Sequence, residues 1–200
     1  MNQSDEASGI GFRKAVQLVA ILNLAYFGIE FMVARAIGSV SLFADSIDFL
    51  EDASINFLIL IVFGWSLARR ARVGMVLAGI LLVPGLAALW TAWQKFALPI
   101  PPAPMPLSIT GACAFAVNLS CAFILARYRT HTSSLAKAAF LSARNDVLAN
   151  IAIVGAGLIT FYNHSPWPDL VVGIGIALMN AGAAKEVYEA ARDEHRKATP

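Results

Sequence analysis

The sequence has 200 residues, of which 58% are hydrophobic and only 14% are charged, whereas soluble domains are about 25% charged. This balance excludes an ordinary soluble protein and indicates a membrane protein. The net charge of +2 gives no reason to expect nucleic acid as a partner, because membrane topology explains the basic residues. The sequence shows no nucleophile–base pair at a recognisable cleft, so we do not expect an enzyme.

An apolar stretch needs about 20 residues to cross a bilayer as a helix. By this criterion we expect an all-α, polytopic membrane protein with six transmembrane helices: Lys14–Ala34, Ser41–Leu67, Val73–Ala97, Pro106–Tyr128, Ser134–Phe161 and Trp167–Ala191. Residues 1–12 are predicted to be a mobile cytoplasmic tail without a cleaved signal, residues 13–192 the six-helix transmembrane domain and residues 193–200 a second short cytoplasmic tail. No second soluble domain is expected.

The Lys and Arg residues fall on alternate connections, and loops rich in them stay in the cytoplasm. The opposite connections hold only Arg35 and Lys95. Both termini are therefore predicted to be cytoplasmic, in a protein of the cell (inner) membrane. The basic residues on the predicted inner side are Arg13, Lys14, Arg69, Arg70, Arg72, Arg127, Arg129, Lys137, Arg192, Arg196 and Lys197.

The second predicted helix carries an unusual group of acids: Asp45, Asp48, Glu51 and Asp52. One ionisable side chain near the centre of a spanning helix costs roughly 2.5–3.5 kcal/mol on insertion scales, so four without partners would oppose insertion. Asp48 and Asp52 are four residues apart and share a helix face, Asp45 leans to the same side, and Glu51 points away. We therefore expect the face to bind a cation.

The fifth predicted helix carries one further carboxylate near its middle, Asp146. Because the second helix runs inward and the fifth outward, Asp52 and Asp146 are predicted to lie at a similar depth near the midplane. Acids from two helices at one depth suggest a shared cation site, in which Asp146 supplies a third carboxylate to Asp48 and Asp52. The chain is therefore interpreted as a cation transporter.

Three segments also resemble the cation diffusion facilitator family of divalent metal transporters. In the fifth helix, the family pattern His-x-x-x-Asp falls on Ser142-Ala143-Arg144-Asn145-Asp146, so that serine stands in place of histidine. The sixth helix is similar to the family in opening with Trp167-Pro168-Asp169. The second-helix signature falls on Ser39-Val40-Ser41-Leu42-Phe43-Ala44-Asp45-Ser46-Ile47-Asp48-Phe49-Leu50-Glu51-Asp52.

The resemblance implies a homodimeric exporter that exchanges a divalent metal ion, usually Zn²⁺, for protons. It implies Asp48, Asp52 and Asp146 as metal ligands, with the Ser142 hydroxyl as a fourth candidate. The metal is the substrate, and no cofactor is expected. A site made only of oxygen atoms suits Mn²⁺ or Fe²⁺ better than one with imidazole, but Zn²⁺ stays first and Cd²⁺ remains open. The family's C-terminal metal-sensing domain is not expected after the sixth helix.

Other polar residues are expected to have supporting or structural roles. Asp45, Asn145 and Glu30 are candidates for supporting the metal ligands or for lining the ion pathway. Asn23 and Asn118 are expected to hydrogen-bond across helices. Structural roles are predicted for Asp169 at the start of its helix, for the small residues Gly173, Ala177 and Ala181, and for the thiols of Cys113 and Cys121.

The expected mechanism is competition between protons and metal for the same carboxylates. If the bundle opens this site to each side in turn, a proton gradient drives the metal in the opposite direction. The main alternative is a non-transporting membrane metal-binding or sensor protein. A transporter of organic cations is less consistent with the sequence, because no aromatic box accompanies Asp48.

Overall fold

The computed structural model describes residues 3–62, 86, 88–126 and 134–198. Nearly all of these residues are helical, which confirms the all-α prediction. A further helical segment, residues 88–97, lies within the predicted third span, most of which falls outside the described residues. The labelled helices are α1 (Gln3–Ile37), α2 (Val40–Val62), α4 (Pro104–Ala126), α5 (Ser134–Asn163) and α6 (Trp167–Ala198).

Two helices are longer than the sequence predicts. Helix α1 begins at Gln3, so most of the expected mobile tail is helical, and α6 continues to Ala198, past the predicted end of its span. The apolar pattern marks only the part of a helix suited to lipid. It cannot show that a polar extension without proline keeps the same backbone hydrogen bonds.

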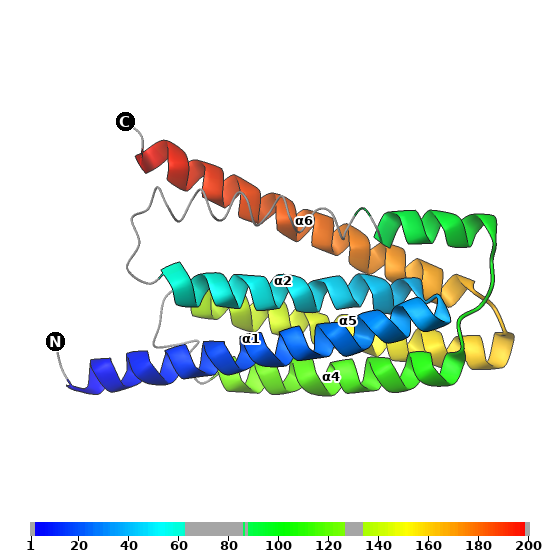
Figure 1. Cartoon of the computed structure of the whole chain (residues 1–200), viewed down its shortest axis with the longest axis horizontal. Helices are drawn as coiled ribbons and strands as arrows, with labels where there is room; N and C mark the ends of the chain where they lie inside the picture. The colour runs from blue at the N-terminus through cyan, green and yellow to red at the C-terminus, as the bar shows by residue number, and fades with distance from the viewer. Residues whose placement is uncertain (1–2, 63–85, 87, 127–133, 199–200) are drawn as a thin grey trace.

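Four helices, α1, α2, α4 and α5, lie alongside one another, and α6 packs against α2 and α5 (Figure 1). Helix α6 lies close to the others at its start and diverges from them towards its C-terminal end. The start of α1 and the end of α6 lie at the same end of the bundle, as expected for an even number of crossings. Helix α1 packs on both α2 and α4, and α4 packs along α5.

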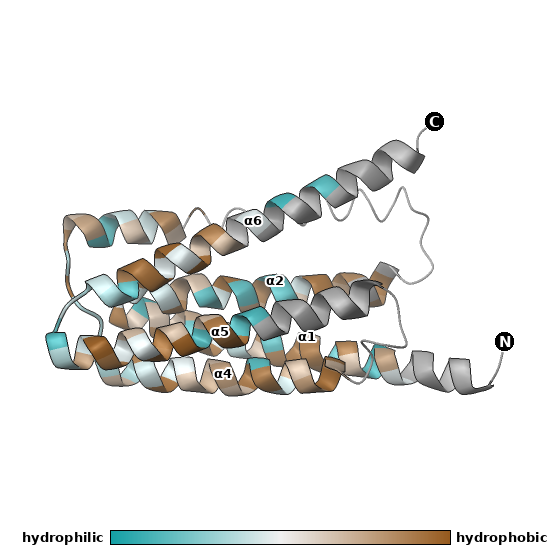
Figure 2. Cartoon of the chain, turned by 180° about the vertical axis from the view of Figure 1, so that it is seen from behind, coloured by the Kyte–Doolittle hydropathy of each residue, from teal (hydrophilic) through white to brown (hydrophobic). Residues whose placement is uncertain are grey.

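The outer surface of the bundle is apolar, as a lipid environment requires. Trp93 and Phe123 are 71% and 68% exposed. Among the described residues, three helical stretches are long and apolar enough to cross a membrane: Gly11–Ile37, Pro104–Ala126 and Asn145–Asn163. Helix α2 differs because hydrophilic positions interrupt its hydrophobic turns, as Figure 2 shows.

Helix α6 approaches the start of α2 at Gly173. A Cβ atom added there would lie 2.7 Å from the backbone nitrogen of Ser41 and from the carbonyl carbon of Val40. Only glycine allows this backbone-to-backbone contact. The predicted close packing is therefore confirmed at Gly173, and Ala177, one turn later, is also buried; the side chain of Ala181 lies outside the described residues.

Candidate metal site

The acids of α2 lie at different degrees of burial. Asp45 is fully buried, Glu51 and Asp52 are 7% and 9% exposed, and Asp48 is half-buried. Helix α2 can carry them because most of its other residues are apolar, and the helix packs against α1, α5 and α6. The bundle interior thus contains carboxylates that neither lipid nor an apolar core would stabilise.

Helix α1 places two polar side chains opposite two of these acids. Asn23 and Glu30 are seven residues apart on α1, and Asp45 and Asp52 are seven residues apart on α2. Because the two helices are antiparallel neighbours, Asn23 meets Asp52 and Glu30 meets Asp45. The Asn23 amide donates to Asp52 Oδ2 at 3.4 Å, and the Glu30 carboxyl lies within interaction range of Asp45.

Helix α5 approaches α2 from another side with Asp146 and, one turn later, Asn150. The carboxyl groups of Asp146 and Asp52 are close enough to share a hydrogen bond when one of them is protonated. Asn150 Nδ2 donates to Asp45 Oδ2 at 2.6 Å, and Asn150 Oδ1 accepts from Asn118 Nδ2 at 3.0 Å. Helices α2 and α5 therefore interact at two positions along their length, through Asp52 with Asp146 and through Asp45 with Asn150.

The carboxylates predicted to bind metal share one region of the bundle. Asp146 acts electrostatically on both Asp48 and Asp52. In the described part of the chain, however, no three acid, imidazole or thiol groups are close enough to hold one metal ion. The Ser142 side chain lies outside the described residues, one helical turn before Asp146. Asn145 is exposed.

A family model, the cation efflux transmembrane domain, matches residues 16–193, from α1 to α6. The chain belongs to the cation efflux family. It is therefore an integral membrane protein and a cation transporter, and the transported substrate of this family is a metal ion. The match confirms the resemblance to cation diffusion facilitators. No curated protein sequence matches the chain.

Sequence reasoning missed part of the polar network of this cation efflux protein. Asn23 was expected to bond across helices, which is confirmed, but its partner was not identified as Asp52. Asn118 also bonds across helices as expected, to Asn150. The common seven-residue spacing of Asn23 and Glu30 and of Asp45 and Asp52 was the available signal, because positions seven apart share a helix face.

The role predicted for Asp169 was incomplete. It lies in the first turn of α6, as expected, but its carboxylate caps the neighbouring helix α2. It accepts from the backbone N–H groups of Val40 and Ser41 at 2.9 and 3.1 Å. It also accepts from the hydroxyls of Ser39 and Ser41, both at 2.6 Å. One buried carboxylate therefore fixes the start of the helix that carries the acids.

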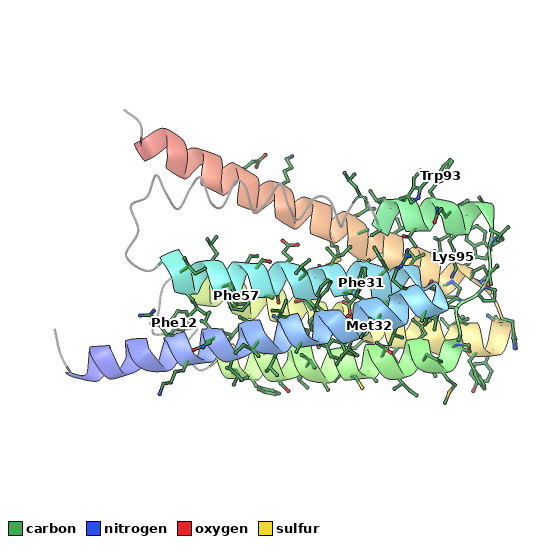
Figure 3. The ribbon with its side chains drawn as sticks, viewed as in Figure 1. Phe12, Phe31, Met32, Phe57, Trp93 and Lys95 are labelled. Carbon is green, nitrogen blue, oxygen red and sulfur yellow. The ribbon has the colours of Figure 1, made fainter. Side chains whose placement is uncertain are left out.

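Lys95 completes this contact between helices. It lies on the side of segment 88–97 that faces the bundle, opposite Trp93, as Figure 3 shows. Its ammonium group lies 3.9 Å from Asp169 Oδ2 and donates to the carbonyl of Gly38. Gly38 has a φ of 64° and forms the turn between α1 and α2. The topology prediction treated Lys95 as a loop charge, whereas it is 9% exposed and paired.

Proposed function

We propose that this cation efflux protein exports a divalent metal ion in exchange for protons, with Zn²⁺ as the first candidate. The observation that supports this most directly is the approach of Asp52 on α2 to Asp146 on α5 in the bundle interior. Two carboxylates at such a place repel each other unless a cation or a proton lies between them. An ion passing through the bundle would meet both of them.

The proposed ligands are Asp48, Asp52, Asp146 and Ser142. The first two are one turn apart on α2, and the other two are one turn apart on α5 by sequence. Each helix can thus present two oxygen ligands to an ion between them, and four is the coordination number that Zn²⁺ favours in proteins. Asn23 would orient the Asp52 carboxylate through its hydrogen bond.

Metal preference follows from the ligand atoms. Carboxylate and hydroxyl oxygens bind Mn²⁺ and Fe²⁺ well, and they also bind Zn²⁺ and Cd²⁺. The absence of imidazole from the proposed set therefore broadens the range of ions. Zn²⁺ remains first because the family resemblance favours it.

Exchange requires that metal and protons exclude each other. A divalent ion neutralises two carboxylates, and protons neutralise the same groups when the ion leaves. If the bundle exposes the site to either side in turn, this competition couples the two fluxes. Both termini would be cytoplasmic, in the cell (inner) membrane, and the functional unit would be a homodimer, as the resemblance implies.

Metal binding to the purified protein tests the ligand assignment. We expect Asp52→Asn to weaken Zn²⁺ and Mn²⁺ binding by roughly tenfold or more, because it removes a charged ligand oxygen in a region of low dielectric. Glu189→Gln is the matched control, since Glu189 is an exposed acid paired with Lys185 on the C-terminal part of α6. Equal affinity in the two variants would contradict the assignment. Isothermal titration calorimetry provides the measurement.

A further inference from the structure

A second acidic group lies outside the proposed metal ligands, where Glu30 of α1 faces Asp45 of α2. Both side chains are 0% exposed. Both carboxylate oxygens of Glu30 and Oδ1 of Asp45 lack a hydrogen-bond partner among the described residues. Unpaired buried carboxylate oxygens are rare because their desolvation is costly, so this pair requires a positively charged partner.

The pair is separated from the proposed metal ligands along the helix axis. Asp45 precedes Asp52 by seven residues of α2, which is roughly 10 Å of helix, towards the Gly38 end of the bundle. The pair is still in electrostatic contact with the metal region, since Asp48 and Asp146 both act on Asp45 or Glu30. A positive charge bound at the proposed metal ligands therefore changes the electrostatic potential at Glu30 and Asp45.

The atoms around the pair favour a proton over a metal ion. Asp45 Oδ2 is already bonded to the Asn150 amide, so that three carboxylate oxygens remain. Those three come from only two side chains, whereas metal ions in proteins take four or more ligands. A single proton is sufficient for two facing carboxylates, because the protonated group donates an O–H···O⁻ hydrogen bond to the other.

The remaining titratable groups near the pair do not provide the missing positive charge. Lys95 is engaged with Asp169 and with the carbonyl of Gly38. Tyr26 already donates its hydroxyl hydrogen to the carbonyl of Thr110 at 2.6 Å. Among the described residues, the titratable groups that interact with the pair are themselves acids: Tyr26 on α1, Asp48 on α2 and Asp146 on α5.

We propose that Glu30 and Asp45 form a proton-binding site, which holds one shared proton and gives it up when a divalent cation binds at the nearby aspartates. This inference rests on the proposed function. The O–H bond of the shared proton breaks, the proton passes to water, and both groups remain as carboxylates. The charge of the incoming ion compensates for the lost proton. Part of the proton coupling would thus arise at a site that does not touch the metal.

The test measures how Zn²⁺ affinity depends on pH in the purified full chain. Each proton that the metal displaces makes the dissociation constant change about tenfold per pH unit, rising as pH falls. We expect Glu30→Gln to lower this slope by about one proton, and Asp45→Asn to do the same. Both changes replace a carboxyl by an amide of similar shape, so two independent variants report on one pair. Glu189→Gln, an exposed acid, should leave the slope unchanged.

Infrared difference spectroscopy provides a direct second readout. The wild-type protein should lose C=O bands of protonated carboxyls when Zn²⁺ is added, and both amide variants should show a smaller loss, because only the protons displaced from the metal-binding aspartates still contribute. If the folded variants keep both the wild-type pH dependence of Zn²⁺ affinity and the wild-type loss of C=O absorption, the proposal is overturned. So would loss of one bound Zn²⁺ per chain in Glu30→Gln, because the pair would then be a metal site.

Failure of the proposed function gives a different result. If Asp52→Asn binds Zn²⁺ as tightly as the wild type, the metal site lies elsewhere and the premise is wrong. If Asp52→Asn abolishes binding but Glu30→Gln retains the full pH slope, the metal site stands and only the proton site is rejected.

Discussion

Asn118 and Asn150 stabilise the buried acid Asp45 through a short chain of hydrogen bonds. Asn118 fixes the amide of Asn150, and Asn150 donates to Asp45. We expect Asn118→Leu to lower the free energy of unfolding by about 1–3 kcal/mol, because it leaves the buried Asn150 oxygen without a donor. Thermal unfolding in detergent measures this effect.

Ser120→Ala is the matched control for that prediction. The residue is exposed, and its hydroxyl donates to the carbonyl of Ala116 in its own helix. The control should change stability by less than about 0.5 kcal/mol. Equal losses in the two variants would show that the Asn118 bond contributes nothing specific.

Ser142 stands where the resemblance expects histidine, and this difference predicts the metal preference. We expect Ser142→His to increase the affinity for Zn²⁺ relative to Mn²⁺, because imidazole nitrogen favours Zn²⁺ over harder ions. A shift of roughly tenfold in the ratio of dissociation constants is the expected scale. Competition binding with both ions measures it, and an unchanged ratio would place Ser142 outside the metal site.

The sequence predicted the acids of the bundle better than their partners. Asp48, Asp52 and Asp146 could be singled out because a charge inside an apolar span is expensive and rare. Partners could not be assigned to Asn23 and Asn150. The free-energy cost of burying an uncharged amide is small, so amides occur inside membrane bundles in many structural roles. Glu30 was a pathway candidate, and only the packing of α1 against α2 showed that it faces Asp45.

At the scale of elements, Asp169 joins α6 to the N-terminus of α2. We expect Asp169→Ala to lower the free energy of unfolding by about 2–4 kcal/mol. It removes a cap from two backbone N–H groups and leaves the buried Lys95 without its acid. Lys185→Ala, which breaks an exposed pair on α6, should have almost no effect.

The comparison of these two variants in one thermal-unfolding series separates a buried cap from a surface ion pair. A loss in Asp169→Ala no larger than that in Lys185→Ala would contradict the capping role. The sequence did not reveal this role, because Asp169 and Ser41 are far apart in the chain and each lies near the start of its own helix. Helix existence was predictable from apolar length, whereas contacts between helix ends depend on three-dimensional packing.

At the scale of the whole molecule, the sequence predicted the class of fold and the family. Composition and six apolar stretches were sufficient, because a bilayer limits spanning elements to long helices or closed barrels. The polar extensions of α1 and α6 were missed, since hydropathy marks only the part of a helix that suits lipid. Hydropathy also cannot predict how α1, α2 and α5 lie relative to one another, and that placement creates the candidate site.

Flux through the purified protein in liposomes tests directly whether it exchanges metal for protons. Vesicles with an acidic interior are placed in Zn²⁺ or Mn²⁺, and both metal uptake and internal pH are followed. We expect metal to enter while the interior becomes less acidic, and Asp52→Asn to abolish both changes. A folded wild-type protein that binds Zn²⁺ but moves neither metal nor protons would contradict metal–proton exchange and would instead support a metal-binding or sensor protein.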